Sequence, residues 1–398
     1  MTKKEVEDRE DPKMSSQADQ VIARQNTHSD RLRALPARYY VDHEILARER
    51  EQLFFKTWQY ACHISELDGP GAYVTTEIMG QNIFVVRDTD GDIKAYYNTC
   101  PHRGHRLVDG AGQKRVIVCP YHQWSFSLDG KLRSLRAETS SEAPTKESIC
   151  LSSVQVDRLL DFVFVNLDPE AEPIAEFWPG VEEHILKVCP DVTTYRLSTS
   201  ATVIHQVDVA ANWKIQIDNY LECQHCRQGH LSFADMLDIT NQYHTLNKNH
   251  AYNFIPSSGK ADNLAYPLDP QHDGMDMHFW FLFPNVGISQ FAGPGNLSLF
   301  QWLPVSTDRA IRLSINLEVA EPTDPGMHER QEKRMIWGRD VLQPEDISFL
   351  LSVQEGMSQR CFQQGWYIID WENQEFSEAM MRHFHDLYLM HMGETAAS

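Results

Sequence analysis

No stretch of the sequence stays apolar over the roughly 18 residues that a membrane-spanning helix needs, so we expect no membrane span. Basic residues are in deficit, because 36 Lys and Arg stand against 56 Asp and Glu, a formal net charge of −20. This charge argues against nucleic acid or an anionic membrane as a partner. Residues 1–35 lack the apolar core of a secretory signal, so we expect a flexible tail over residues 1–38 and a cytoplasmic protein.

Cysteine is sparse as well, with eight in 398 residues. In a large cytoplasmic chain this usage does not indicate a disulfide framework, and metal ligation is the better explanation for cysteines that cluster. The chain is 42% hydrophobic and 23% charged, which excludes the fibrous and disordered classes. Its length predicts two domains rather than one.

The first half of the chain predicts a helix followed by short strands. Residues 42–58 place apolar side chains at helical spacing. From residue 71 to about residue 168, short apolar runs alternate with turn signals such as Asp129-Gly130, and no helix-length pattern interrupts them. We therefore expect a small all-β domain, with strands that include residues 83–86 and 161–165.

The second half of the chain mixes both kinds of element. Residues 212–230 are long enough for a helix. Strands are predicted over residues 278–283, 297–303 and 311–319. The last of these alternates strictly between apolar and polar side chains, which predicts a strand with one face exposed to water. Helical stretches follow at about residues 325–341, at 345–360 and at the end of the chain, so we expect an α+β domain with an antiparallel sheet.

Two short loops of the β region carry metal-ligating residues. Cys100-Pro-His102 is followed, after 16 intervening residues, by Cys119-Pro-Tyr-His122. Two thiolates and two imidazoles suit a tetrahedral zinc ion, or a two-iron cluster in which two histidines replace two cysteines on one iron. Zinc fingers usually pair Cys with Cys and His with His, whereas each loop here contributes one of each. The spacing therefore favours the two-iron cluster.

The second loop continues as Gln-Trp-Ser-Phe and then Asp129-Gly130. The pattern Cys-Pro-His-Arg-Gly…Cys-Pro-Tyr-His-x-Trp-x-Phe…Asp-Gly closely resembles the Rieske domain of the ring-hydroxylating oxygenase superfamily. The resemblance implies a Rieske [2Fe-2S] domain with its flanking helix over residues 39–168, and it makes His105 a loop residue rather than a ligand. Gln123 stands where the family most often has Gly, and we expect this departure to alter local packing but not ligation.

A second cluster of metal-ligating residues follows Asn212. Cys223-x-x-Cys226 with a histidine suits half of a zinc knuckle, but no second Cys-x-x-Cys exists to complete that site. His225 and His230 suit two arms of a facial triad of two histidines and one carboxylate, which binds Fe(II) and leaves three positions open. On a regular helix these two side chains point about 140° apart. We therefore expect the helix to be distorted or to end between them, for which Gly229 is a plausible place.

This segment also resembles the catalytic domain of the same oxygenases, in which an acidic residue stands three positions before the first histidine. Glu222 holds that position. In the family the iron carboxylate comes from a late helix with the pattern Glu-Asp-x₇-Gln-x-Gly, which the sequence after Glu345-Asp346 matches. The resemblance implies Asp346 as the third ligand, with Glu345 and Asp340 as alternatives, and a helix-grip (START-like) catalytic domain over residues 169–398.

The family resemblance also implies how the two iron centres cooperate. In the family, the cluster of one subunit serves the iron of its neighbour within a cyclic homotrimer, and a flavin/ferredoxin-type reductase delivers electrons from NAD(P)H. An acidic residue links a cluster histidine to an iron histidine across the interface. By position it is Glu222, between His122 and His225. Asp218, one turn earlier, is the alternative, and it is equally well explained as a helix-surface or capping acid.

The substrate is indicated less directly. The string Asp-Asn-Tyr-Leu-Glu-Cys-x-His-Cys is most similar to the branch that oxidises quaternary ammonium compounds such as carnitine, choline and glycine betaine. Aromatic faces bind such cations. The candidates for the cage are Tyr220, Trp280, Phe291 and Trp302, although aromatic residues in strands more often belong to the core.

Three other functions are weighed against this one. An aromatic-ring-hydroxylating oxygenase, which needs a largely apolar pocket, is the alternative within the enzyme class. An electron carrier without chemistry of its own is disfavoured by the predicted triad. A zinc-stabilised binding module would be colourless, whereas a two-iron cluster absorbs visible light.

Overall fold

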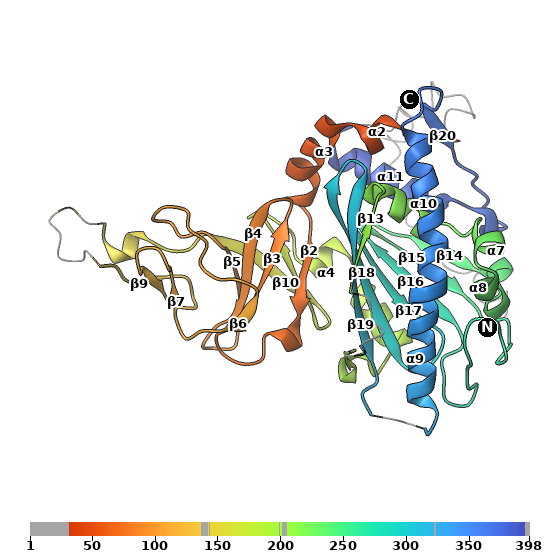
Figure 1. Cartoon of the computed structure of the whole chain (residues 1–398), viewed down its shortest axis with the longest axis horizontal. Coiled ribbons are helices and arrows are strands. Elements are labelled where there is room, and N and C mark those ends of the chain that lie inside the picture. Colours follow the sequence, from red (N-terminus) through yellow and green to blue (C-terminus); the bar gives the residue numbers. More distant parts are fainter. Residues whose placement is uncertain are drawn as a thin grey trace, which may run out of the picture.

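The structure, a computed structural model, describes residues 32–136, 142, 144–198, 200, 205–321 and 324–394. Most of the expected N-terminal tail lies outside these residues. The last part of it includes strand β1 (Arg33–Pro36), which pairs with β20 (Gln364–Trp366) near the other end of the chain. The described chain forms a lobe of strands and a second lobe in which helices cover a sheet (Figure 1). No helix among the described residues is long and apolar enough to cross a membrane.

The N-terminal lobe is all-β, as the turn signals predict. Its main sheet has seven strands among the described residues, in the order β2-β11-β10-β5-β4-β3-β6. They are β2 (Gln59–His63), β3 (Ala72–Ile78), β4 (Gln81–Arg87), β5 (Ile93–Tyr97), β6 (Ala111–Gln113), β10 (Ser153–Leu159) and β11 (Phe162–Asn166). A smaller sheet consists of β7 (Ile117–Val118), β8 (Ser125–Phe126) and β9 (Leu132–Ser134). The candidate ligand loops lie beside this smaller sheet.

The helix expected before the first of these strands is shorter than predicted. Asp42 caps α3 (His43–Glu49) by accepting a hydrogen bond from the backbone N of Glu44 at 2.8 Å. The helix continues as the π-helical turn η2 (Arg50–Phe54) and ends there. Trp58 therefore follows the helix instead of lying on its face, and it is buried in the core.

The C-terminal lobe is built on an antiparallel sheet. The order of its strands is β12-β19-β18-β17-β16-β15-β14, and β13 also pairs with β19. The strands are β12 (Arg196–Leu197), β13 (Gln206–Val209), β14 (Tyr243–Leu246), β15 (His250–Ile255), β16 (Met277–Leu282), β17 (Val286–Gln290), β18 (Asn296–Ser306) and β19 (Arg309–Glu318). The predicted strands of this half are confirmed as β16, β18 and β19.

One long helix lies across this sheet (Figure 1). It runs without a break through α9 (Met327–Trp337), the π-helical turn η7 (Gly338–Leu342) and α10 (Gln343–Met357). The two helices predicted here are therefore one, and Pro344 lies inside it, directly after the π-helical turn η7. A long helix against an antiparallel sheet is the helix-grip arrangement, so the predicted α+β fold class is confirmed.

The remaining helices surround the sheet and join the lobes. They are α2 (Arg38–Val41), α4 (Ile174–Phe177), α5 (Val181–Val188), α6 (Trp213–Tyr220), α7 (Cys226–Gly229), α8 (Leu231–Met236) and α11 (Ala379–His391). Short 3₁₀ turns lie at Ile64–Glu66, Lys146–Ser148, Val192–Thr194, Ile239–Asn241 and Gln374–Phe376. The largest apolar core is continuous between the lobes: the ring of Phe164 on β11 packs edge-on against Trp178, with 5.2 Å between the ring centroids.

The prediction of a water-exposed face on β19 is wrong. The polar side chains of Arg312, Ser314 and Asn316 line a cavity under the long helix. The apolar Leu313 and Ile315, on the other face of the strand, pack against the main core. Alternation shows that the two faces of a strand differ in polarity, but both faces of this strand are covered.

Candidate metal centres and substrate cavity

Two tight loops of the N-terminal lobe bring the first four predicted ligands together. In the first loop, the backbone N of Cys100 donates to the carbonyl of His105 at 2.8 Å. In the second, the backbone N of Cys119 donates to the carbonyl of Trp124 at 2.8 Å. These bonds fold each loop back on itself, so that its Cys and His project to the same side.

The side chains of the two loops fit a two-iron cluster. Cys100 and Cys119 are only 1% and 2% exposed, and their thiols lie close enough to share a hydrogen bond. The rings of His102 and His122 lie 4.5 Å apart between centroids, and both Nδ1 atoms are buried without a hydrogen-bond partner. Unpaired buried nitrogens of this kind are costly unless a ligand satisfies them. A cluster held by two thiolates and two Nδ1 atoms would satisfy them.

Two neighbouring residues behave as the resemblance implies. The His105 side chain is exposed and its Nδ1 lies 2.5 Å from the carbonyl of Arg106, so it turns away from the ligand set. Gln123 has a φ of +61°, in the left-handed region that favours glycine. This backbone conformation gives a physical reason for the glycine that the family most often has at this position.

The second cluster of ligands lies where one helix ends and another begins. α6 stops at Tyr220, and His225 stands immediately before the short helix α7. The expectation that no regular helix spans the two histidines is thus confirmed, and α7 ends at Gly229. A Cβ at Gly229 would lie 2.7 Å from the ring of Phe349, so the absence of a side chain there lets α10 approach the histidines.

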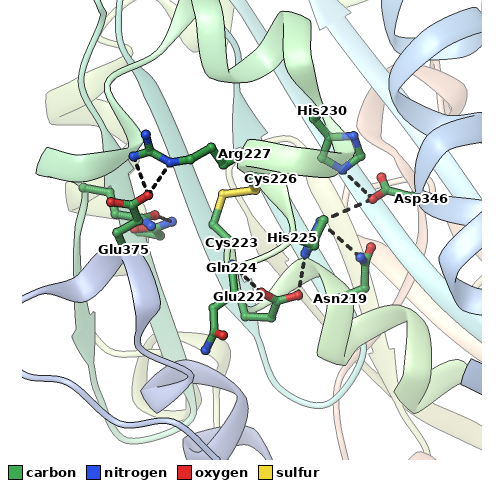
Figure 2. The surroundings of a disulfide bond; sticks show 12 residues. Asn219, Glu222, Cys223, Gln224, His225, Cys226, Arg227, His230, Asp346 and Glu375 are labelled. Atoms are coloured by element: carbon green, nitrogen blue, oxygen red, sulfur yellow. Dashed lines mark hydrogen bonds and ion pairs between the residues drawn. A yellow bond between two sulfur atoms is a disulfide. The ribbon is translucent and has the colours of Figure 1, made fainter.

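A disulfide bond between Cys223 and Cys226 closes the loop that precedes α7 (Figure 2). The general expectation that clustered cysteines bind metal rather than form disulfides is wrong for this pair, whereas the rejection of a zinc knuckle here agrees with the structure. The next residue, Arg227, donates from Nε to the buried carboxylate of Glu375 at 2.8 Å. The disulfide and this ion pair both fix the start of α7, directly after His225.

The three predicted iron ligands converge (Figure 2). One potential ligand atom from each of His225, His230 and Asp346 lies within 4.8 Å of the other two. Asp346 Oδ1 is 2.9 Å from Nε2 of His230 and 3.7 Å from Nε2 of His225. All three face one point, as a facial triad requires.

Two further carboxylates orient the imidazoles. Glu222 accepts a hydrogen bond from Nδ1 of His225, and Glu345 lies 2.8 Å from Nδ1 of His230. A carboxylate on the far nitrogen holds a ligating imidazole in the tautomer that presents Nε2 to a metal. Glu345, one of the two alternatives to Asp346, therefore supports a ligand rather than being one. Asp340, the other alternative, is paired with Arg339 at the surface.

The electrostatics of the triad match a cation site. Burial raises the pKa of Asp346, but its hydrogen bonds to His225 and His230 outweigh this effect and bring the pKa to about 2. Burial lowers the pKa of His225, but the hydrogen bonds to Asp346 and Glu222 raise it to about 9. A divalent cation takes the place of these protons, because imidazole binds metals only when its ligating nitrogen is deprotonated. The donor set therefore fits Fe(II).

Asp218 does not lie beside the iron ligands. Its carboxylate accepts a hydrogen bond from the hydroxyl of Tyr40 at 2.7 Å and lies 2.8 Å from Nε2 of His385. The second nitrogen of His385 bonds to the hydroxyl of Tyr367 at 2.6 Å. Asp218 thus joins α6 to α2 and α11, which favours the structural explanation over the bridging one.

A cavity of about 140 Å³ opens beside the triad. Three of the four predicted cage residues line it: Tyr220, Phe291 and Trp302. The prediction for Trp280 is wrong, because β16 directs this residue to the opposite face of the sheet. There it is fully buried, and its indole N donates to Nδ1 of His184 at 3.2 Å.

Several cavity residues were not found from the sequence. They include Asn219, Phe233, Phe279, Phe300 and Arg312. Asn219, whose side-chain N lies 3.2 Å from Nε2 of His225, stands inside the motif that drew attention to Tyr220 and Glu222. Phe279 follows from strand parity once Trp280 is known to face away. The sequence marks Arg312 only as a cation within the alternating strand.

Comparison with known proteins agrees with both centres. Residues 57–153 match the model of the Rieske [2Fe-2S] domain, and residues 198–394 match that of the ring hydroxylating alpha subunit (catalytic domain). The carnitine monooxygenase oxygenase subunit of Escherichia coli (strain K12) is 33% identical over 89% of this chain and 92% of the relative. The chloroplastic choline monooxygenase of Amaranthus tricolor is 26% identical over 88% of this chain and 76% of the relative.

Comparison with solved structures gives the same result. The crystal structure of a quaternary ammonium Rieske monooxygenase in complex with L-carnitine superimposes with a TM-score of 0.77 and 28% identity, covering 91% of this chain and 97% of that chain. Sequence motifs, ligand geometry and relatives agree on an oxidoreductase that carries a [2Fe-2S] cluster and a mononuclear iron. The chain therefore belongs to the Rieske non-haem iron oxygenases, in the ring-hydroxylating alpha-subunit family.

Proposed function

We propose that this chain is the oxygenase subunit of a monooxygenase that uses O₂ and electrons from NAD(P)H to hydroxylate, cleave or N-demethylate a small quaternary ammonium compound of the carnitine or betaine type. The aromatic lining beside the triad carries the proposal. The rings of Tyr220 and Trp302 lie 5.0 Å apart between centroids, and Phe279 lies 6.2 Å from Tyr220. A methylated ammonium group that enters the cavity meets these faces and is bound by cation–π attraction, which aqueous anions and neutral molecules do not share.

The residues around the cavity orient the iron ligands and keep water away from the reacting end of the substrate. When bound, the cluster stores and passes electrons and the iron activates dioxygen. Glu222 and Glu345 hold the two imidazoles in one orientation, and the phenylalanines of the lining exclude water from the reacting end of the substrate. Tyr220 is itself held: its hydroxyl bonds to the Ser289 hydroxyl at 3.0 Å, so its ring keeps a fixed face toward the cavity.

The assembly and its partners are part of the same proposal. Residues 39–168 and 169–398 act as the Rieske and catalytic domains, a flavin/ferredoxin-type reductase supplies the electrons, and the enzyme works in the cytoplasm as a homotrimer. Glu222 connects His225 to His122 of a second copy. Its carboxylate supports this role because it already contacts His225 while its side chain remains 15% exposed.

Turnover with a reductase tests the proposal. Purified protein loaded with both iron centres should consume NADH and O₂ with carnitine, betaines or choline, and each product molecule formed should account for one NADH. The matched panel contains aromatic acids and hydrocarbons of similar size. Product from the aromatic compounds and none from the ammonium compounds would overturn the substrate assignment and favour the ring hydroxylase. Product analysis is needed because uncoupled NADH consumption yields none.

A further inference from the structure

We propose that Arg312 forms a carboxylate-binding subsite next to the iron cavity, so that the substrate is a zwitterion with a carboxylate a few bonds from its quaternary nitrogen. This inference rests on the proposed function and narrows it. Cations without an acid group, such as choline, then become poor substrates. The subsite consists of Arg312 and the polar end of the neighbouring cavity.

Arg312 lies on the cavity face of the sheet. It stands directly opposite Trp302 in the β18–β19 ladder, and directly opposed residues project to the same side of a sheet. Its side chain lines the iron cavity and also a second cavity of about 110 Å³. Phe291, Phe300, Leu342 and Asp346 also line both, so the two cavities adjoin at Arg312. The second cavity adds Ser314, Asn316 and Arg334, whereas Tyr220 lines only the first.

The guanidinium group of Arg312 has no anion of its own. Its Nε is buried without a hydrogen-bond partner, and no carboxylate in the described part of the chain forms an ion pair with it. Arg330 and Arg334, on the helix that covers the sheet, each have a carboxylate partner instead. Arg330 pairs with Asp273 at 2.8 Å, and Arg334 pairs with Glu318 at 2.6 Å. A guanidinium group whose Nε is buried without a partner is costly, so its retention in a cavity points to a ligand that supplies the opposite charge.

Among the residues that the structure describes, no neighbouring group supplies this missing negative charge. The guanidinium carbon lies 5.7 Å from the centre of the Phe300 ring, a contact that offsets part of the cost of burial but leaves the N–H donors free of a partner. The nearest carboxylate of the cavity, Asp346, is engaged by both iron histidines. A second buried Nε without a partner, that of Arg334, lines the same cavity. Because Glu318 already compensates the charge of Arg334, Arg312 supplies the uncompensated charge of the cavity, and the Nε of Arg334 is a further unpaired N–H donor for a planar anion.

The arrangement fits a zwitterion in one direction. The ammonium group lies against Tyr220 and Trp302 beside the triad, and the carboxylate reaches past Trp302 to the guanidinium group of its cross-strand neighbour. The ends cannot be exchanged without cost, because a carboxylate over the aromatic faces meets their negative quadrupoles and an ammonium group at Arg312 meets a like charge. The subsite therefore selects substrates and also sets which end lies near the iron.

The experiment compares γ-butyrobetaine with its primary amide, which keeps the shape and the cation but removes the negative charge. The wild-type protein should favour the carboxylate in kcat/KM by about 10- to 150-fold, the range for a hydrogen-bonded charge. Arg312→Met should reduce this ratio to near one, and Arg312→Lys should restore part of it. Isothermal titration of the iron-loaded protein should show the same change in the ratio of the two Kd values. Arg309→Met is the matched control, since Arg309 lies on the same strand but forms an exposed ion pair with Asp208.

Two outcomes overturn the subsite. In one, the wild-type protein has the same kcat/KM for the acid and for the amide. In the other, Arg312→Met weakens both compounds equally while the cluster absorbance and circular dichroism match the wild type. Failure of the proposed function looks different, because then neither compound binds or is oxidised by the wild-type protein. If Arg312→Met does not fold, the Arg312→Lys variant and the wild-type ratio still decide the question.

Discussion

A buried ion pair connects the flanking helix of the N-terminal lobe to the catalytic lobe, and breaking it should be severe. The Nζ of Lys214, in the first turn of α6, lies 2.5 Å from Glu49 Oε1 at the end of α3, and both side chains are fully buried. Glu49 also accepts hydrogen bonds from Trp213 Nε1 at 2.9 Å and from the hydroxyl of Tyr388, on α11, at 2.6 Å. One carboxylate therefore holds together three helices that are distant in sequence.

The variant Lys214→Met leaves the charge of Glu49 buried without its counter-ion. Loss of one partner of a buried pair costs about 3–5 kcal/mol. For a lobe of this size, each kcal/mol lowers Tm by about 2–4 °C, so the midpoint should fall by about 6–20 °C. The double variant Lys214→Met with Glu49→Gln removes both charges but keeps an oxygen acceptor for Trp213 and Tyr388. It should recover most of the loss, because a neutral pair carries no large desolvation cost.

Thermal unfolding followed by far-ultraviolet circular dichroism measures this loss, and the visible absorbance of the cluster reports separately on the N-terminal lobe. The cluster signal should survive to a higher temperature than the helical signal in Lys214→Met. The reasoning is refuted if Lys214→Met unfolds within about 2 °C of the wild type. It is also refuted if the double variant is no more stable than the single one, since the loss would then come from packing rather than from the unpaired charge.

Four further predictions concern the site and pH. Glu222→Gln should keep both metals but lower product formation by roughly 10- to 100-fold, measured as product per electron with iron content as the control. Asp346→Asn should weaken iron binding at least about tenfold, measured by metal analysis, while the cluster absorbance is retained. In Gly287→Ala the new Cβ would lie 2.8 Å from the Tyr220 ring, so the ring must shift and the Kd for L-carnitine should rise, measured by titration calorimetry. Burial, with the charges of nearby histidines, lowers the pKa of His250 to about 4, so the unfolded chain takes up this proton first as the pH falls below about 6.5. The contribution of neutral His250 to the free energy of unfolding is thus complete above that pH and is lost toward pH 4, by up to about 2 kcal/mol at pH 5. Between pH 7 and pH 5, the free energy of unfolding of His250→Gln should therefore fall less than that of the wild type.

The ligand sets could be predicted because the chain itself keeps their members close. Cys100 and His102 share one tight loop, and Cys119 and His122 share another. Such loops have few ways to fold, so residue type and spacing nearly determine the chemistry. The third iron ligand, Asp346, comes from a distant helix, and no local pattern places it there. Only the family resemblance connected it to the histidines.

What could not be predicted depends on which face of an element is covered. Phe279 and Trp280 are adjacent aromatic residues of one strand, and parity sends one to the cavity and the other to the opposite core. Nothing in their own sequence distinguishes the two faces, because both are buried. The loop between α6 and α7 is a similar case. Its Cys-x-x-Cys lacks the second pair that a zinc site needs, but nothing in the sequence shows that its two sulfurs are bonded to each other.

A polar face on a strand such as β19 can be exposed to water or can line a cavity. Arg309 and Arg312 lie on one strand, three residues apart. Arg309 lies on the opposite face of the strand from Arg312, at its exposed start, and is paired with Asp208. Arg312 lies under the long helix and has no acid partner among the described residues. Folding alone gains nothing from a cation there, since an apolar residue would pack more favourably. The position of the covering helix therefore changes the meaning of the alternating pattern, from a solvated surface to a site that is complete only with an anion bound.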